Sequence, residues 1–319
     1  MSRAIGKRAL RALAAGAIAA CGLCVAAAAP AVASHAAPLP PIDAATSLLV
    51  VAPHPDDETL CCAGIMQRVV QAGGRASVVW LTSGDAERLG LWLFEAALFL
   101  DPAGARQLGE RRMTEARAAT ALLGVRTDGQ LFLGYPDGGL ARLLGANRSA
   151  AYTSRSTGVA AVPYRDALFP AHPYTGESLE RDFATVLERT RPTLILAPSP
   201  RDEHPDHRAA GLLTIVVSAR RGALPRVRYW IVHGGEGWPS PRELMPGVPF
   251  TSAPLAGALA PTTFALIPAE EDRKLLAVRA YATQMRAMAP FLLAFVRSDE
   301  LFYPLAGRQI PGGPLRSPQ

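Results

Sequence analysis

The sequence is poor in cysteine, with four in 319 residues. Cys21 and Cys24 lie in an Ala-rich apolar run near the N-terminus, and Cys61 and Cys62 are adjacent. Adjacent cysteines do not readily bridge each other, so we expect no disulfide framework. We interpret Cys61 and Cys62 as small buried apolar residues rather than as metal ligands or nucleophiles.

Other absences narrow the class of protein. No block of Lys and Arg resembles a nucleic-acid footprint, although the net charge is +6, so we expect no nucleic-acid partner. No Gly-x-Gly-x-x-Gly follows the first predicted strand, so nothing supports a dinucleotide cofactor. There are no internal repeats. The composition, 49% hydrophobic and 19% charged, is that of an ordinary globular chain.

Residues 1–35 have the composition of an export signal. A basic region ends at Arg11, an apolar run covers 12–29, and Ala31-Val32-Ala33 fits the small-x-small cleavage rule. A membrane anchor is the first alternative, because the run approaches the roughly 17–25 residues that cross a bilayer. A lipoprotein signal around Cys21 is the second. All three predict an exported domain that is periplasmic, secreted or membrane-anchored.

Strands and helices are predicted to alternate along residues 44–305. Apolar runs predict strands at 47–52, 76–81, 130–133, 193–197, 227–232 and 264–267, and helical patterns predict helices at 58–72, 109–123, 178–190, 205–219 and 269–288. Residues 140–176 are predicted to be a long loop, and 306–319 a loose tail. The alternation predicts one α/β domain with a Rossmann-like, mostly parallel sheet and helices on both faces.

Two His/Asp clusters follow two of these strands. Pro53-His54-Pro55-Asp56-Asp57-Glu58 follows strand 47–52, and Asp202-Glu203-His204-Pro205-Asp206-His207 follows strand 193–197. Ligands of open α/β sheets bind outside the carboxyl ends of the strands, so we expect the active site there. Two His and one carboxylate are a common ligand set for a catalytic zinc, with one position left open for water.

The spacing within the first cluster separates two tasks. His54 and Asp57 are three residues apart, and in a strand-to-helix turn both side chains can reach one metal ion. Asp56 lies between them and can instead face the water and accept its proton. The alternative is that Asp56 or Asp57 only caps the next helix.

The second cluster has the same spacing. Of His204 and His207, one can bind metal while the other faces the substrate carbonyl and stabilises the oxyanion of a tetrahedral intermediate. Asp206 either orients one of these imidazoles or caps the helix that follows.

These motifs resemble those of the LmbE-like, or PIG-L, family of zinc-dependent N-acetylglucosamine deacetylases. The resemblance extends to residues 108–116, 133–138, 173–179 and 280–284, and covers most of 47–285. It implies that His54, Asp57 and His207 bind zinc, with iron(II) as the alternative metal. It further implies that Asp56 is the general base and that His204 stabilises the oxyanion or donates a proton.

The resemblance also implies that Arg112 and Asp137 contact substrate. From the residues alone, a surface ion pair between Arg112 and Glu115 and a turn role for Asp137 are the alternatives. The implied activity is removal of an N-acetyl group from a glucosamine unit of a small-molecule or cell-envelope glycoconjugate. Another metal-dependent amidase or esterase on the same fold, or a non-catalytic carbohydrate-binding protein, are the competing hypotheses.

Two features bear on the substrate. Some relatives have an aromatic residue two positions before the matched oxyanion histidine, and here that position is Asp202. Residues 89–100 are apolar nearly all round a helix, which predicts burial against the sheet or, alternatively, contact with a membrane surface beside the site. The single histidines His172 and His233 are expected to be structural, although His233 follows a strand and can line the pocket.

Overall fold

The computed structural model describes residues 38–86 and 101–305. Its central sheet is built from five parallel strands. The strands are β1 (Ser47–Ala52), β2 (Arg75–Thr82), β3 (Gln130–Tyr135), β4 (Leu194–Pro198) and β5 (Val227–Trp230). The predicted signal at 1–35, the apolar segment at 89–100 and the tail at 306–319 lie outside the described residues.

The strand order β3-β2-β1-β4-β5 places β1 at the centre of the sheet. Leu49 of β1 pairs with Ser77 of β2 on one side and with Ile195 of β4 on the other. Both faces of a parallel sheet are covered, which is why its strands are nearly continuous apolar runs. The chain leaves β1 toward β2 and β3 and then crosses to β4, so the strand order reverses between β1 and β4. The mostly parallel α/β fold is confirmed.

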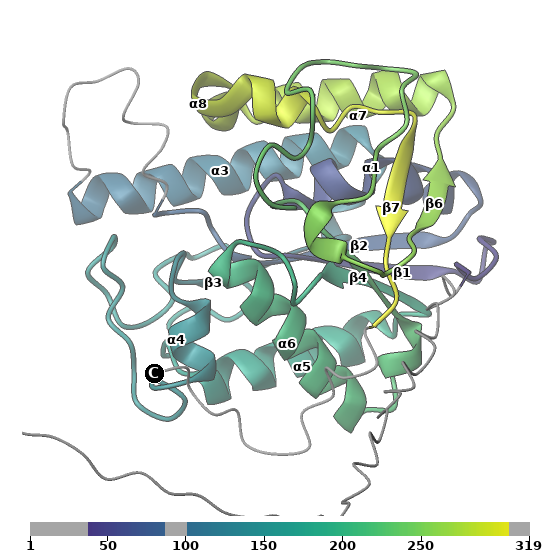
Figure 1. Cartoon of the computed structure of the whole chain (residues 1–319). Coiled ribbons are helices and arrows are strands. Elements are labelled where there is room, and N and C mark those ends of the chain that lie inside the picture. Colours follow the sequence, from purple (N-terminus) through teal and green to yellow (C-terminus); the bar gives the residue numbers. More distant parts are fainter. Residues whose placement is uncertain (1–37, 87–100, 306–319) are drawn as a thin grey trace, which may run out of the picture. The chain divides into compact units, whose positions relative to one another are not determined.

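Helices cover both faces of this sheet (Figure 1). One face carries α1 (Asp57–Gln71), α3 (Pro102–Leu122), α7 (Pro268–Ala280) and α8 (Ala282–Leu293), and the other carries α4 (Leu140–Leu144), α5 (Gly176–Thr190) and α6 (Pro205–Arg220). Short 3-10 helices are η1 (Thr127–Gly129), η2 (Leu224–Arg226) and η3 (Pro254–Ala256). None of the helices in the described ranges is both long and apolar enough to span a bilayer.

A second, antiparallel sheet consists of β6 (Thr262–Ala265) and β7 (Asp299–Phe302). Beyond β7 the chain reaches β5, where Tyr303 and Tyr229 form an isolated antiparallel bridge. This second sheet therefore ties the C-terminal part of the described chain to the edge of the central sheet.

The predicted helix 269–288 is wrong in one respect, because the structure divides it. Helix α7 ends before Tyr281, whose φ and ψ are −80° and 68°, and α8 begins after it. Within α8, Met288 has non-helical angles (φ −141°, ψ 33°) two residues before Pro290. A proline lacks the N–H that a helix interior uses and crowds the preceding turn, which accounts for the local break.

Two further elements differ from the sequence prediction. Helix α3 begins at Pro102, seven residues before the predicted start, because Asp101 accepts a hydrogen bond from Gly104 N (2.7 Å) and proline suits the first helical position. The predicted loop 140–176 contains the short helix α4 and a bridge between Ala161 and Pro173.

Candidate active site

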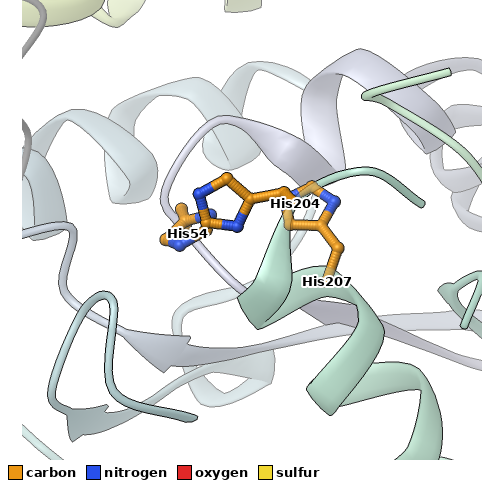
Figure 2. Close-up of side chains that lie close together, drawn as sticks. All are labelled: His54, His204 and His207. Atoms are coloured by element: carbon orange, nitrogen blue, oxygen red, sulfur yellow. The ribbon is translucent and has the colours of Figure 1, made fainter. Parts of the chain in front are cut away.

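The first His/Asp cluster forms the turn between β1 and α1. His54 N donates to Asp57 Oδ2 (2.9 Å), and Asp57 N donates to His54 O (3.4 Å). Residues 48–52 before this turn are fully buried, which anchors it to the centre of the sheet. The turn aims the His54 ring toward the ring of His204, at the start of α6 (Figure 2), with the two ring centroids 4.8 Å apart.

The second cluster forms the start of α6. His204 is the N-cap, and its Nδ1 accepts a hydrogen bond from Asp206 N (3.2 Å). Pro205 occupies the first helical turn, where its missing N–H is tolerated. His207 follows on that turn and is fully buried. Because Nδ1 of His204 is an acceptor, a neutral His204 ring carries its proton on Nε2.

Asp57 lies between two imidazoles. Its Oδ2 is 3.3 Å from His54 Nδ1 and 3.2 Å from His207 Nε2. A tetrahedral metal site with bonds of about 2.0–2.1 Å places neighbouring ligand atoms roughly 3.3 Å apart. These two separations therefore match the edges of such a site.

The other nitrogen of each imidazole faces a carboxylate. His54 Nε2 is 3.2 Å from Asp137 Oδ1, and His207 Nδ1 is 3.2 Å from Asp202 Oδ2. A carboxylate behind the imidazole is the usual support for a metal-binding histidine, because it fixes the ring and its tautomer. The fold thus brings the three predicted ligands together, and a carboxylate lies behind each of the two imidazoles.

A buried ring nitrogen without a hydrogen bond is a natural position for a metal ion. His207 Nε2, the nitrogen that lies beside Asp57, is buried and makes no well-aligned hydrogen bond with the described residues. Burial alone would lower the pKa of His207, but the carboxylates of Asp202 and Asp57 raise it to about 9. Metal binding would have to displace that proton, as it does wherever an imidazole becomes a ligand. The donor set fits a divalent metal ion.

Asp56 occupies the N-cap position of α1, yet its side chain makes no capping hydrogen bond. Its φ of 125° is in a region that non-glycine residues rarely adopt, at a cost on the order of 1–3 kcal/mol. Its carboxylate lies 3.3 Å from Arg112 Nη2 and lines the pocket. The capping alternative for Asp56 is therefore wrong, and the strained backbone instead turns the carboxylate toward the pocket.

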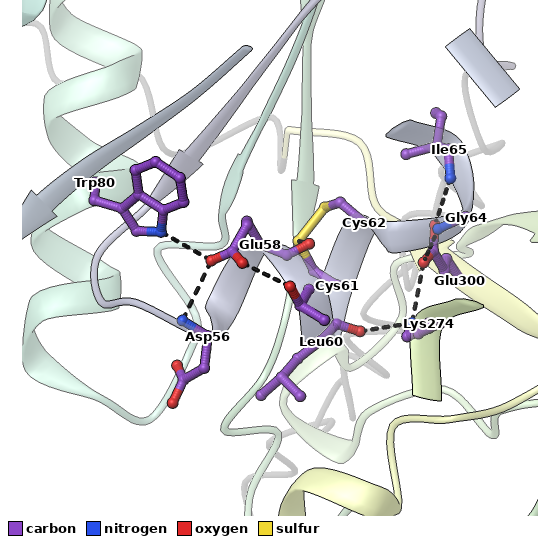
Figure 3. Close-up of a disulfide and its surroundings, with 11 residues drawn as sticks. Asp56, Glu58, Leu60, Cys61, Cys62, Gly64, Ile65, Trp80, Lys274 and Glu300 are labelled. Carbon is purple, nitrogen blue, oxygen red and sulfur yellow. Dashed lines mark hydrogen bonds and ion pairs between the residues drawn. A yellow bond between two sulfur atoms is a disulfide. The ribbon is translucent and has the colours of Figure 1, made fainter. Parts of the chain in front are cut away.

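Glu58 holds this strained backbone in place (Figure 3). Its carboxylate accepts hydrogen bonds from Asp56 N (3.2 Å) and Trp80 Nε1 (2.9 Å). It also accepts one from the Tyr281 hydroxyl. Glu58 is fully buried, and this burial raises its pKa above the usual value, although the Thr59 hydroxyl and these donors oppose the rise. The sequence alone predicted no role for Glu58. Its partners come from β2 and from the α7–α8 junction, so the motif alone could not reveal them.

One turn further along α1, Cys61 and Cys62 form a disulfide (Figure 3). This corrects the expectation that the adjacent cysteines stay unbridged, whereas their predicted burial is confirmed. At this point α1 also bonds to other elements. Leu60 O accepts from Lys274 Nζ (2.8 Å), and Gly64 N donates to Glu300 Oε1 (2.8 Å).

Asp206 does not cap α6. Its carboxylate accepts hydrogen bonds from Gly138 N (2.7 Å) and Leu140 N (3.1 Å), in the loop after β3. Its Oδ2 also lies 3.4 Å from His54 Nε2. Asp206 therefore joins the second cluster to the loop that carries Asp137 and lies against the His54 ring, as the orienting alternative expects.

Arg112 reaches the site from α3. Its Nη2 donates to Pro55 O (2.8 Å) beside Asp56, and its Nη1 donates to Gly84 O (3.1 Å). The alternative of a surface pair with Glu115 is wrong, because Arg112 is buried and Glu115 accepts hydrogen bonds from Thr283.

Asp137 follows β3 and points into the same pocket. Its Oδ2 accepts from Ala86 N (3.1 Å), while its Oδ1 faces His54. Burial would raise the pKa of Asp137, but His54 and Arg112 hold it well below its usual value. Asp137 is thus ionised and placed beside both a predicted metal ligand and Arg112.

Asp202 organises more of the site than the sequence indicated. Its Oδ1 accepts from His204 N (2.9 Å), and its Oδ2 accepts from Val232 N (2.9 Å) and His233 N (3.1 Å) while facing His207. In the sequence, the one indication that Asp202 lies near the site was its position in the second cluster, five residues before His207. The contacts with the end of β5 depend on the folded sheet and have no signature in the local sequence.

These side chains surround a cavity of about 210 Å³. Its lining is His54, Asp56, Asp57, Leu60, Ala86, Arg112, Asp137, His204, Val232, His233, Gln284, Met288, Phe291 and Leu292. The cavity opens at the carboxyl ends of the parallel strands, beside the reversal of strand order between β1 and β4, which is where α/β sheets bind ligands.

Comparison with protein families matches residues 49–218 to PIG-L, described as GlcNAc-PI de-N-acetylase. This match spans both clusters. The chain is 28% identical over 310 residues to the 1D-myo-inositol 2-acetamido-2-deoxy-alpha-D-glucopyranoside deacetylase of Nakamurella multipartita, covering 85% of this chain and 93% of that protein. The enzyme of the same name from Kribbella flavida is 28% identical over 303 residues, covering 83% and 93%.

Among solved structures, the deacetylase of the antimicrobial reagent A40926 pseudoaglycone is similar in fold. It superimposes with a TM-score of 0.53 at 20% sequence identity, covering 82% of this chain and 97% of that one. At this level of identity the likeness concerns the arrangement of the strands and helices.

Proposed function

The chain belongs to the PIG-L family, and from that premise we propose that it is a metal-dependent hydrolase that removes an N-acetyl group from an N-acetylglucosamine-type glycoconjugate. The relatives named above are deacetylases of a 2-acetamido-2-deoxy-glucopyranoside, which supports amide hydrolysis on an amino sugar. The observation that carries the proposal is the position of Asp57 Oδ2, within 3.3 Å of one nitrogen from each of two imidazoles, with the Asp56 carboxylate lining the same cavity.

His54, Asp57 and His207 are the proposed metal ligands, and zinc is the proposed metal. Two imidazoles and one carboxylate are ligands that zinc prefers, and iron(II) accepts the same set. When bound, such an ion supplies Lewis acidity, which polarises an acyl carbonyl and makes a coordinated water more acidic.

Asp56 is the proposed general base. Its carboxylate lines the cavity and lies 3.3 Å from Arg112 Nη2. It accepts a proton from the attacking water and later returns that proton to the amine nitrogen as the C–N bond breaks. One water is consumed, and acetate and a free amino sugar leave.

His204 is the proposed donor to the oxyanion. Burial, together with the nearby His54, lowers the pKa of His204 to about 3, so without a metal ion the ring is neutral near pH 7. Its Nδ1 accepts from Asp206 N, so its Nε2–H is free to donate to the carbonyl oxygen as negative charge develops there. Arg112 and Asp137 are the proposed contacts to the sugar.

We also propose export of the domain. The basic, apolar and small-residue stretches within 1–35 support it, with cleavage near Ala33 as the favoured outcome.

Acetate release tests the activity. The purified protein is incubated with the inositol-linked N-acetylglucosamine that the relatives' names specify and, in parallel, with N-acetylglucosamine, and acetate and free amine are both quantified. We expect equal amounts of the two products. His207→Ala should lose bound metal and turnover together, because two ligands hold a metal ion poorly. A wild-type protein that releases no acetate, or a His207→Ala variant with stoichiometric metal, contradicts the proposal.

A further inference from the structure

The lining of the active-site cavity holds two unlike kinds of side chain. The His/Asp clusters, Arg112 and Gln284 are polar. The apolar lining residues are called the apolar wall here, and they are Leu60, Val232, Met288, Phe291 and Leu292. None of these five side chains carries a hydrogen-bonding oxygen or nitrogen. Within the described residues, this wall can offer a substrate only apolar contact.

The break in α8 shapes much of this wall. Met288 has non-helical backbone angles, and Pro290 follows inside the same helix, so the chain between them leaves the regular helical path. Met288 and Phe291 are half-buried rather than fully covered, while Leu292 is buried. Two of the five side chains therefore keep exposed apolar surface beside the reacting groups.

Neighbouring rings hold Phe291 in place. It stacks on His233 with centroids 5.7 Å apart and an interplanar angle of 11°, and it meets Phe295 edge to face at 5.2 Å. The guanidinium of Arg242 lies 5.4 Å from its centroid. A side chain with three such contacts is pre-positioned, so a ligand that binds against it need not order it.

The chemistry of the wall selects against a hydroxyl-rich group. A sugar or cyclitol hydroxyl pressed against it loses its hydrogen bonds to water and gains none in return. An aliphatic or aromatic group at the same place removes apolar surface from water on both sides. The inositol named for the relatives' substrates is a polyol, so its hydroxyls would gain no hydrogen bond from these five side chains.

We propose that the substrate carries an apolar group next to the scissile amide, and that the apolar wall is its binding subsite. This inference rests on the proposed deacetylase function and narrows its substrate class. The same chemistry can come from two sources, an N-acyl chain longer than acetyl or an apolar aglycone attached to the amino sugar. The experiment separates the two.

Three probes share one amino sugar. They are methyl 2-acetamido-2-deoxy-α-D-glucopyranoside, its octyl counterpart, and the methyl glycoside that carries hexanoyl in place of acetyl. The kcat/KM for amine release is measured for each with the metal-loaded wild-type protein. We expect one apolar probe to exceed the methyl acetyl probe by on the order of tenfold or more, the scale that added methylenes reach in a hydrophobic pocket. The octyl arm identifies an aglycone site, and the hexanoyl arm an acyl site.

Met288→Gln tests the wall directly, because it keeps the length of the side chain and adds an amide. We expect it to lower the ratio of kcat/KM between the preferred apolar probe and the methyl acetyl probe by roughly threefold to tenfold, chiefly through KM. Met285→Gln is the matched control, since Met285 lies on the same helix, is half-buried and does not line the cavity. It should leave the ratio unchanged.

Several outcomes overturn the inference. It is wrong if neither apolar probe exceeds the methyl acetyl probe, or if Met288→Gln lowers kcat/KM by one common factor for all three. If no probe is hydrolysed, the proposed function fails, and calorimetric binding of the same probes to the Asp56→Asn variant decides the subsite separately. Tighter binding of an apolar probe then supports the wall as a subsite, and equal binding refutes it.

Discussion

Asp56 and Asp57 are neighbours with identical side chains, and the backbone gives them different surroundings. Asp57 starts α1 and directs Oδ2 between His54 and His207. Asp56 has a positive φ, and its carboxylate reaches the cavity beside Arg112. Conservative substitutions at the two positions should therefore have different effects.

We expect Asp56→Asn to keep its metal and lose turnover, because an amide cannot accept the proton of water. Removal of a general base typically lowers the rate by about 100- to 10,000-fold. Asp57→Asn is the matched control and should weaken metal retention instead. Metal content by mass spectrometry and kcat for acetate release are measured on both. A near-normal kcat in Asp56→Asn would show that Asp56 is not the general base.

Asp85 is a buried carboxyl at the end of β2. It accepts hydrogen bonds from the Tyr164 hydroxyl and from Asp137 N (3.4 Å). Burial, and next the negative charge of Asp137, raise the pKa of Asp85 from 3.8 to about 7. Between about pH 4 and pH 7, Asp85 is therefore protonated in the folded protein and ionised in the unfolded chain.

This shift predicts a pH dependence of stability. Because the pKa is higher in the folded state, the folded protein is favoured at low pH and loses stability as the pH rises through this window. The slope reaches at most about 1.4 kcal/mol per pH unit. Asp85→Asn should remove that slope. The free energy of unfolding of both proteins is measured with urea at pH 5.5 and at pH 7.5. If the two proteins differ in this free energy by the same amount at both pH values, the shifted pKa is contradicted.

The sequence placed His54, Asp57 and His207 together because both clusters follow strands, and the ends of parallel strands meet at one edge. It could not place Asp202, whose partners Val232 and His233 lie about 30 residues away at the end of β5. Likewise, the partners of Glu58 are distant in sequence. A motif predicts its own spacing, but the side chains that orient it depend on which strands become neighbours.

At the scale of elements, the buried parallel strands were predicted most closely. The strand predicted at 47–52 has the same bounds as β1, because a strand covered on both faces is a continuous apolar run. Strand β7 was missed because it begins with Asp299 and Glu300, which are charged residues and yet buried. The structure satisfies them with Phe250 N (2.7 Å) and with Lys274 Nζ (3.0 Å).

Lys274 and Glu300 form a fully buried ion pair between α7 and β7 that also binds the backbone of α1. Replacing Lys274 with Met leaves the Glu300 carboxylate buried without its counter-ion. Breaking a buried pair in this way costs about 3–5 kcal/mol. We expect that loss in chemical denaturation of Lys274→Met, with partial recovery in the double variant Lys274→Met/Glu300→Gln. A loss below about 1 kcal/mol would show that the pair is not coupled to folding.

At the scale of the whole molecule, the site results from the strand order. The clusters are about 150 residues apart in sequence, yet β1 and β4 are hydrogen-bonded neighbours. The mostly parallel arrangement was predictable from alternating strands and helices. The apolar wall was not, because it depends on the break in α8 and on the packing of that helix over the cavity.

The most direct test of a metal-dependent deacetylase at this site is one titration. Acetate release from the inositol-linked N-acetylglucosamine is followed in the protein as purified, after a chelator has removed its metal, and as zinc is added back, with bound metal quantified at each point. We predict that turnover is lost with the metal and returns in proportion to zinc, up to one ion per chain. Full turnover in the metal-free protein, or one bound zinc per chain without acetate release, would contradict the account.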